Sequence, residues 1–414
     1  MPLRRTVLLL VICAVPAPAD DWPQWQGPKR DGGTTEKVAP WKEALPVLWR
    51  APAGHGFSTP AIADGRVFIH ARVGTKDQEE VVAFDATTGK ELWRDSYPRA
   101  PYKSAVGVGP RATPAVAGGR VYTFGITGVL SCYQADSGKR LWQADLYQKL
   151  NASLPTFGVC CSPLVLGNRV LVSVGGQGHS LVALDAETGE IKWQALDEGA
   201  SSSSPVLFAG GPRGRGALPD VVFQTPLRLV GVNPLDGTLN WEHPMTFQPS
   251  GTSATPVVCG DRIVAGTIDA GVTAVQVAAD GEKVKTTEEW RNKDYTVYFS
   301  SGLAVGFDQL YLVTNVTKPL PSATLRCVDP KTGKEWWKKS GIGYFHAGLV
   351  RTGDDKLLIL DDAGTLKLID ANPKEYRELC QAKICSGTLI APAIANGKLY
   401  ARDDKDVICV KLAE

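Results

Sequence analysis

The chain lacks a strong charge of either sign. Its 414 residues hold 45 Lys and Arg against 43 Asp and Glu, a formal net charge of +2, and the basic residues are scattered. A nucleic-acid-binding domain concentrates positive charge in a patch or stripe. The composition therefore argues against nucleic acid as a partner.

Several catalytic motifs are also missing. No spacing of His and Cys matches a zinc site, no Gly-rich loop opens a helix as a phosphate site requires, and there is no serine elbow. Residues 175–178 form a Gly-rich run, but it lies between two expected strands and is a turn. The sequence thus shows no self-evident catalytic centre.

The mature chain lacks an apolar run long enough to cross a bilayer, which needs about 20 residues. The first residues are Arg4 and Arg5, a short apolar run over residues 6–15 and small residues before position 20. These are the three regions of a secretory signal peptide. We expect residues 1–19 to be removed after Ala19, leaving a periplasmic or secreted protein without a membrane span.

What the chain has in abundance is an internal repeat. Residues 83–93 and 183–193 share the pattern Ala-x-Asp-x-x-Thr-Gly-x-x-x-Trp, and each follows a short apolar strand, a Gly turn and a second strand. A period of this length predicts a stacked or circular repeat architecture. Eight copies can be counted from inner strands that are expected to begin near Ser58, Ala112, Cys161, Ser203, Ala254, Ser300, Phe345 and Ala391.

Each copy reads as a four-stranded antiparallel unit, and its outer strand usually carries a tryptophan. These are Trp93, Trp142, Trp193, Trp241, Trp290 and Trp337, and Leu379 is assigned to that place in the seventh copy. A large ring with one N–H group suits a half-polar seam. We therefore expect these rings to pack between neighbouring units rather than to contact a ligand.

The eighth copy has room for only three strands before the chain stops. Residues 45–50 carry the strand-to-Trp signature without inner strands of their own. Pairing them with the C-terminal strands would satisfy both free sheet edges. The prediction is one all-β domain over residues 45–414, an eight-bladed β-propeller closed by an N-terminal strand, with residues 20–44 an extended segment packed on the outside.

Removal of the leader would leave eight cysteines, an even number in an oxidising compartment. Cys132, Cys327 and Cys409 occupy equivalent third-strand positions and are expected to be small core residues far from one another. Cys380 and Cys385 are close enough for a local bridge. Cys160 and Cys161 are adjacent and fall in a different place, at the start of the third inner strand.

The repeat resembles that of the pyrroloquinoline quinone (PQQ) family of eight-bladed propellers. The match is strict at residues 83–93 and 183–193, near at 327–337 and degenerate elsewhere, with Gln134 and Asn233 in place of Asp. The resemblance implies one of two functions. One branch consists of periplasmic quinoprotein dehydrogenases that use PQQ and Ca²⁺; the other consists of non-catalytic propellers similar to the lipoprotein of the outer-membrane barrel-assembly machine.

Residues that would face the central funnel should distinguish these branches. The inner ends of the crossing loops contribute an aromatic and hydroxyl-rich ring without carboxylates, whereas Ca²⁺ needs six to eight oxygen ligands and a dehydrogenase needs a carboxylate base. Asp269, Asp361 and Asp362 are assigned to hairpin turns. The candidate binding residues are His55, Phe57, Arg111, Phe157, Cys160, Cys161, Ser202, Ser203, Tyr298, Phe299, Tyr344, Phe345 and His346.

The pair Cys160-Cys161 resembles the adjacent-cysteine disulfide on which quinoprotein alcohol dehydrogenases stack PQQ, opposite a Trp. No Trp is expected among the funnel residues, so inert packing is preferred for the pair. The prediction is a non-catalytic binding or scaffolding propeller without a cofactor or metal, whose funnel face contacts a protein segment or a small polar ligand. The alternatives are a PQQ- and calcium-dependent alcohol or sugar dehydrogenase and a carbohydrate-binding propeller.

Overall fold

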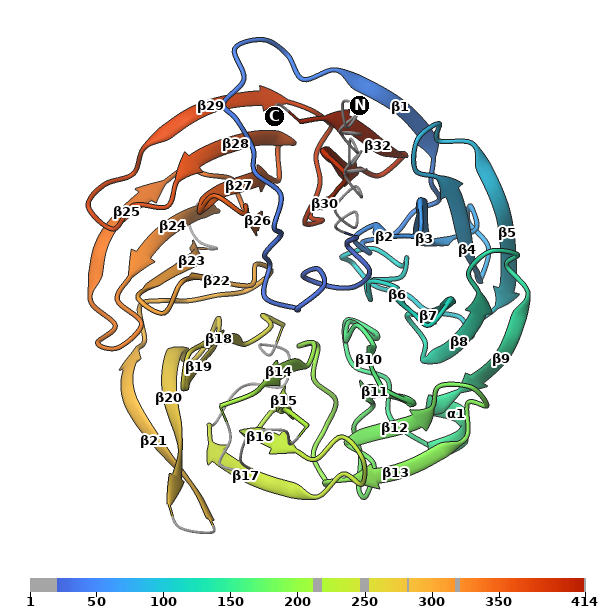
Figure 1. Cartoon of the computed structure of the whole chain (residues 1–414). Helices are drawn as coiled ribbons and strands as arrows, with labels where there is room; N and C mark the ends of the chain where they lie inside the picture. The colour runs from blue at the N-terminus through green and yellow to red at the C-terminus, as the bar shows by residue number, and fades with distance from the viewer. Residues whose placement is uncertain (1–20, 211–217, 246–252, 281–282, 317–320, 413–414) are drawn as a thin grey trace, which may run out of the picture.

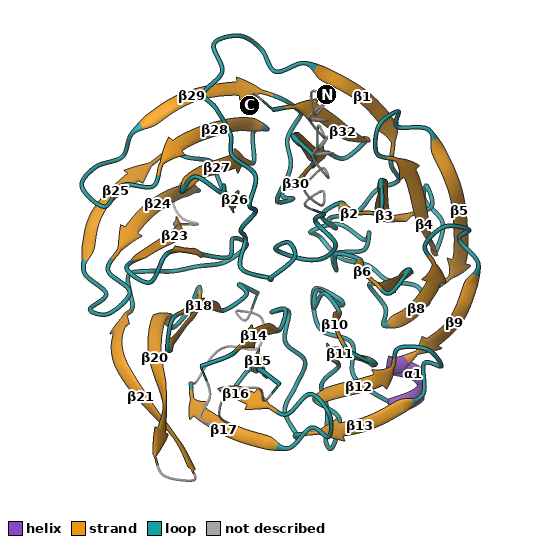
Figure 2. Cartoon of the chain, in the orientation of Figure 1, coloured by secondary structure: helices purple, strands orange, loops and turns teal. Residues whose placement is uncertain are grey.

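The computed structural model describes residues 21–210, 218–245, 253–280, 283–316 and 321–412. These residues form eight four-stranded antiparallel sheets arranged as blades around one axis (Figure 1). Apart from one short helix, the secondary structure is strand, turn and loop (Figure 2). The predicted eight-bladed propeller is therefore confirmed. The expected leader, residues 1–19, lies outside the described residues.

The strands follow the chain from the inside of each blade to the outside. Blades one and two are β2 (Ala61–Ala63), β3 (Arg66–Arg72), β4 (Gln78–Asp85), β5 (Glu91–Pro98), β6 (Ala115–Ala117), β7 (Arg120–Phe124), β8 (Val129–Gln134) and β9 (Arg140–Asp145). After helix α1 (Leu146–Leu150), blades three and four are β10 (Leu164–Leu166), β11 (Arg169–Ser173), β12 (Leu181–Asp185), β13 (Ile191–Ala195), β14 (Val206–Phe208), β15 (Asp220–Gln224), β16 (Arg228–Val232) and β17 (Leu239–Pro244).

The second half of the ring repeats this order. Blades five and six are β18 (Val257–Cys259), β19 (Arg262–Thr267), β20 (Gly271–Asp280), β21 (Lys283–Asn292), β22 (Leu303–Val305), β23 (Gln309–Val316), β24 (Ser322–Val328) and β25 (Glu335–Ser340). Blade seven is β26 (Ala347–Arg351), β27 (Lys356–Asp361), β28 (Thr365–Asp370) and β29 (Glu378–Lys383).

Blade eight joins the two ends of the chain. Its inner three strands are β30 (Ala393–Ala395), β31 (Lys398–Arg402) and β32 (Asp406–Lys411), and its outer strand is β1 (Val47–Pro52). In the antiparallel register Trp49 faces Cys409 and Arg50 faces Ile408. The predicted ring closure is confirmed, and it leaves neither end of the propeller with an unpaired strand.

Inner strands begin two or three residues later than the sequence suggested. In blades one to five the strand starts directly after a proline, for example at Ala61 after Pro60 and at Ala115 after Pro114. Proline has no N–H to donate to a ladder, so pairing can begin only beyond it. The residues before each proline are thereby left to line the central channel.

The outer tryptophans form the seams between blades, as predicted. Trp49 of blade eight lies over Gly89 in the turn that joins β4 to β5, and its indole Nε1 donates to the Ala86 carbonyl at 3.2 Å. Gly89 has a φ of +71°, a conformation that favours glycine. The same contact recurs for Trp93, Trp142, Trp193 and Trp290, each over a glycine of the following blade.

Three seams depart from this pattern, and each precedes a blade that lacks the Asp-x-x-Thr-Gly turn. Blade seven lacks the turn, and Trp337 of blade six lies over none of the described glycines but donates to the Asn372 carbonyl at 2.7 Å. Blade five lacks the motif, and Trp241 of blade four donates instead to Asp220 Oδ2 within its own blade at 2.8 Å. Blade eight has no such turn because its outer strand comes from the N-terminus. Correspondingly, the register pairs Leu368 with Cys380, so Cys380 takes the Trp position of blade seven and the assignment of Leu379 was wrong.

Only the end of the N-terminal segment packs on the outside of the propeller, where the Trp41 N–H donates to Cys380 Sγ of the outer strand β29. Residues 22–37, here called the strap, run through the middle of the ring (Figure 1). The strap exchanges hydrogen bonds with Ile62 in blade one and Arg351 in blade seven, and it accepts bonds from Val116 in blade two and Gly397 in blade eight. It then leaves the channel, and the chain continues to β1.

Arg30 is the most deeply held side chain of the strap. It is 2% exposed, and its guanidinium donates to the carbonyls of Ser162, Pro163 and Pro205 at 3.3, 3.0 and 2.8 Å. Burial lowers the pKa of Arg30 to about 10. Three backbone carbonyls at the inner edges of the blades thus bind a cationic side chain inside the channel. The sequence predicted only the ends of the crossing loops there.

All eight cysteines of the described residues are free thiols. Cys132, Cys327 and Cys409 are fully buried in three separate apolar clusters, which confirms the core assignment. The local bridge considered for Cys380 and Cys385 is not formed. In the part of the chain that is described, no helix is long and apolar enough to cross a membrane.

Candidate functional site

A belt of hydroxyl side chains surrounds the central channel. Six blades place Ser or Thr at the same position, directly before the proline or glycine that precedes the inner strand: Thr59, Thr113, Ser162, Ser204, Thr255 and Ser301. The backbone N–H of one member donates to the hydroxyl oxygen of the next, for example from Thr113 to Ser162 at 2.9 Å. The same bond joins Thr59 to Thr113, Ser162 to Ser204 and Thr255 to Ser301.

This belt explains why the sequence keeps small hydroxyl residues at that position. Each bond crosses from one blade to its neighbour, so the belt ties the inner edges of the blades together as the tryptophans tie the outer edges. A hydroxyl that accepts one such bond still has its own proton to donate. Those protons are available to a molecule in the channel.

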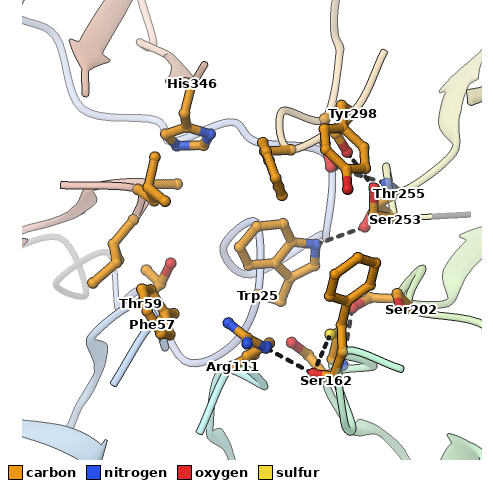
Figure 3. A pocket seen from close by; sticks show the side chains of 18 of the residues that line it. Trp25, Phe57, Thr59, Arg111, Ser162, Ser202, Ser253, Thr255, Tyr298 and His346 are labelled. Atoms are coloured by element: carbon orange, nitrogen blue, oxygen red, sulfur yellow. Dashed lines mark hydrogen bonds between the residues drawn. The ribbon is translucent and has the colours of Figure 1, made fainter. Parts of the chain in front are cut away.

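Above the strap, the channel opens into a pocket with a cavity volume of about 180 Å³ (Figure 3). Its lining combines aromatic rings with hydroxyl groups and holds a single permanently charged residue. The lining residues are Trp25, Phe57, Thr59, Val106, Arg111, Phe157, Cys160, Ser162, Ser202, Ser204, Ser253, Thr255, Tyr298, Phe299, Ser301, His346, Leu389, Ile390 and Ala391.

Trp25 was missed by the sequence reasoning, as were the belt hydroxyls that line the pocket. It comes from the strap and lies in the middle of the pocket in Figure 3, where its indole Nε1 donates to Thr255 Oγ1 at 2.9 Å. The expectation that no Trp faces the funnel was therefore wrong. The available signal was the pair Trp22 and Trp25 in a segment outside the repeat, since a segment with two large rings needs an apolar place to bury them.

The walls of the pocket are mostly aromatic. Phe57, Phe157 and Tyr298 were predicted and all line it, together with the more exposed Phe299. Arg111 lies over the Phe57 ring at 4.9 Å, and its Nε donates to the Phe157 carbonyl at 2.8 Å. The guanidinium thus fixes two walls of the pocket.

His346 lines the pocket and carries an unpartnered polar atom that is closed off from solvent. Its side chain is buried, Nδ1 lies 3.1 Å from Ser300 Oγ, and Nε2 has no hydrogen-bond partner among the described residues. Burial lowers the pKa of His346 to about 4, so the imidazole is neutral at pH 7. Thr59 Oγ1, also buried and also in the lining, is unpartnered within the same described part.

Tyr344 and Phe345 lie outside the pocket, at its rim. Tyr344 is 65% exposed and Phe345 is 38% exposed. The Asp362 carboxylate accepts hydrogen bonds from the backbone N–H groups of Tyr344, Phe345 and His346, at 2.9, 2.5 and 3.2 Å to the nearer oxygens. Asp362 is therefore more than a turn residue, because it holds the loop that presents two rings to solvent.

The remaining predicted residues lie near the pocket without lining it. His55 is half-buried and packs edge-on against Phe57, with ring centroids 5.2 Å apart. Ser203 is buried, whereas its neighbour Ser202 lines the pocket. Cys161 is buried below Cys160, and its sulfur accepts from the Ser173 N–H at 3.5 Å.

The donor set does not fit the calcium that accompanies PQQ in the dehydrogenases. No Asp or Glu belongs to the pocket lining, and no group of three His, Cys, Asp or Glu side chains among the described residues could hold a metal ion. Ca²⁺ requires several oxygen ligands, usually including carboxylates. Burial raises the pKa of the Cys160 thiol, which is also unfavourable for a reactive thiolate.

Comparison with known proteins finds relatives of several kinds, among them BamB proteins and quinohemoprotein dehydrogenases. A family model described as "Outer membrane protein assembly factor BamB" matches residues 42–106 and 77–339. A BamB from Yersinia pestis is 25% identical over 309 residues, covering 70% of this chain and 71% of that protein. A quinohemoprotein alcohol dehydrogenase, ADH IIB of Pseudomonas putida, is 27% identical over 143 residues, but these are 33% of this chain and 19% of that enzyme.

Solved structures show the same fold in both groups. BamB from Moraxella catarrhalis superposes with a TM-score of 0.59 at 15% identity, covering 89% of this chain and 98% of that one. The quinohemoprotein alcohol dehydrogenase of Comamonas testosteroni superposes with a TM-score of 0.63 at 14% identity, covering 95% and 80%. At such identities the likeness is one of fold, and a fold shared by both groups does not decide function.

Proposed function

This chain belongs to the PQQ-repeat family described as outer membrane protein assembly factor BamB, and from that membership we propose that it is an extracytoplasmic, non-catalytic scaffold. It binds a protein partner in outer-membrane protein assembly through its funnel face. The contact is made by the aromatic rim, which comprises Phe299, Tyr344 and Phe345 with the exposed Val106 and Leu389. The periplasm is the compartment in which such a scaffold works.

The observation that carries this proposal is the loop held by Asp362. Large apolar side chains on a free surface are costly to keep exposed, and contiguous ones mark interaction sites. Here three consecutive backbone N–H groups bind one carboxylate, so Tyr344 and Phe345 are held outward in a fixed geometry. A partner that docks on them does not have to order the loop, which reduces the entropic cost of binding.

The second candidate function is a quinoprotein dehydrogenase. It is favoured by Trp25 and Cys160, which line one pocket and supply the ring and the sulfur expected of a PQQ site. The lining lacks the carboxylates that would bind Ca²⁺ or act as a base, so the scaffold fits the residues better. Calorimetric titration with PQQ, with and without Ca²⁺, separates the two, because only the enzyme would bind the quinone in a Ca²⁺-dependent way.

The scaffold is tested by photo-crosslinking from the rim. A photoreactive residue at position 344 should capture a defined protein in cells of the source organism, whereas one at Phe307 should not. Phe307 is a matched control because it is 74% exposed but belongs to a turn between β22 and β23, away from the funnel pocket.

Affinity for the captured partner, once purified, gives the decisive number. Tyr344→Ala with Phe345→Ala should weaken binding about tenfold or more, as loss of central aromatic anchors does. Phe307→Ala should leave the affinity unchanged. Equal affinities for the wild type and the double variant would rule out the rim as the contact surface.

A further inference from the structure

Behind the rim, the funnel pocket has the composition of a ligand site in its own right. We propose that it binds a carbohydrate: one uncharged, hydroxyl-bearing sugar ring seated on the aromatic walls within the hydroxyl belt. The pocket and the rim share Val106, Phe299 and Leu389, but the rim residues Tyr344 and Phe345 do not line the pocket, so variants at those two positions test the protein contact alone.

The rings supply the surface on which a sugar lies. Trp25 occupies the middle of the pocket, with Phe57 and Tyr298 on different sides of it (Figure 3). Phe157 also belongs to the lining. The face of an aromatic ring is electronegative, so it attracts the weakly positive C–H groups on the face of a sugar ring. The cavity of about 180 Å³ is large enough for a ligand rather than for one or two waters.

The hydroxyl belt favours a sugar over an apolar ligand. Ser162, Ser204 and Ser301 each accept a backbone N–H bond from the preceding blade, which leaves their own protons free to be donated into the channel. An apolar side chain or lipid tail seated here would cover these groups without pairing them. Each buried polar group left unpaired costs about 1–3 kcal/mol, whereas sugar hydroxyls would accept these protons.

Two buried atoms already lack a partner in the described part of the chain. His346 Nε2 and Thr59 Oγ1 are both buried and both belong to residues that line the pocket. Both atoms are closed off from solvent, and their residues also line a smaller void of about 20 Å³. They therefore do not select a ligand by themselves, and the rings and the hydroxyl belt are what favour a sugar.

The charge of the lining disfavours cations and ligands with several negative charges. Arg111 is its only permanently charged residue, and its Nε and one terminal nitrogen already donate to the carbonyls of Phe157, Val106 and Gly107. A cationic ligand would find no carboxylate, and a ligand with several carboxylates would find one cation for all of them. An uncharged polar ring carries neither penalty.

The test is calorimetric titration of the mature protein with maltose, cellobiose and di-N-acetylchitobiose. At least one should bind with a Kd below about 1 mM, a level that calorimetry resolves. Phe157→Ala and Tyr298→Ala, both on partly exposed loops, should weaken that binding about tenfold or more, and Trp25→Phe should weaken it by removing the larger ring. Tyr344→Ala and Phe307→Ala should leave it unchanged.

Each other outcome counts against the proposal. Absence of binding by all three sugars would overturn it, and so would binding that survives Phe157→Ala and Tyr298→Ala together. Saturable binding of PQQ, or of an aromatic peptide, that is abolished by Phe157→Ala would assign the pocket to a different ligand class. Tyr344→Ala tests the protein contact at the rim, whereas Phe157→Ala and Tyr298→Ala test the sugar site. A negative result for one proposal is therefore distinguishable from a negative result for the other.

Discussion

The seam between blades eight and one can be broken by adding one methyl group. Gly89→Ala would place a Cβ atom 2.6 Å from Trp49 Cδ2 and 2.7 Å from Cε3, distances that real contacts do not reach. The Trp49 side chain would have to leave its position, since it lies on β1, the strand that closes the ring. Gly65→Ala is a matched control in the same blade, because its φ is +70° against +71° and nothing lies within 4 Å of the added carbon.

The two substitutions separate backbone strain from packing. An alanine in the left-handed region costs about 1–2 kcal/mol, which is the expected effect of Gly65→Ala. Gly89→Ala carries the same cost and also displaces a ring that is 7% exposed and donates to the Ala86 carbonyl. Removing a buried Trp entirely lowers the unfolding free energy by about 3–5 kcal/mol. Partial displacement of the ring should therefore make Gly89→Ala about 2–3 kcal/mol more destabilising than Gly65→Ala.

Equilibrium unfolding in guanidinium chloride, followed by circular dichroism, measures both values. Repeating Gly89→Ala in a Trp49→Ala background, which removes Cγ as well as the ring, completes a double-mutant cycle. There the cost of Gly89→Ala should fall to that of Gly65→Ala, since the ring is gone. If Gly65→Ala and Gly89→Ala cost the same in the wild-type background, the Trp-on-glycine seam does not stabilise the ring.

Three further predictions concern the strap, the pocket and the rim. Arg30→Met should lower the unfolding free energy by about 2–4 kcal/mol. Arg30→Lys should not restore the stability, because the three carbonyls match the fork of a guanidinium group. Hydrogen exchange over the strap should become faster in both variants, and unchanged exchange would contradict the prediction. The pKa of His346 is lowered from 6.5 to about 4 in the folded protein. The contribution of the neutral imidazole to stability is therefore complete above pH 6.5. About 3 kcal/mol of unfolding free energy should be lost as the pH falls from 6.5 to 4. His346→Gln should flatten that pH dependence of the unfolding free energy, and an unchanged slope would assign it to other groups. Asp362→Asn should raise the proteolytic sensitivity of residues 343–346 and weaken partner binding, because three backbone N–H groups lose their carboxylate acceptor. Unchanged proteolysis and unchanged affinity would show that the carboxylate does not hold the loop.

Most of the architecture follows from the sequence because it is repeated. Each copy carries its own turn signals, such as Asp64 and Gly65, both of which take positive φ as a two-residue hairpin requires. Each Asp-x-x-Thr-Gly motif caps its own turn, as when Asp85 Oδ1 accepts from the N–H groups of Thr87 and Thr88. Local rules of this kind need no knowledge of distant contacts, so blade number, strand order and ring closure could be predicted.

The candidate site was only partly predictable. Phe57, Arg111, Phe157, Cys160 and Tyr298 could be placed at the funnel because they occur at loop positions that the repeat defines. Tyr344 and Phe345 occur at equivalent positions but point to the rim, because the backbone of their loop binds Asp362 from another turn. That contact joins residues 17 and 18 positions apart and leaves no periodic signal.

The sequence by itself determined a closed ring of eight blades, since every unit repeats the same short-range chemistry. Only the tertiary structure decided what fills the ring. The strap has no periodicity, and the positions of Trp25 and Arg30 depend on blade edges more than 100 residues away, Thr255 for the one and Pro163 with Pro205 for the other. The hydroxyl belt likewise exists only when neighbouring blades meet, because each N–H finds its acceptor on the next blade rather than on its own.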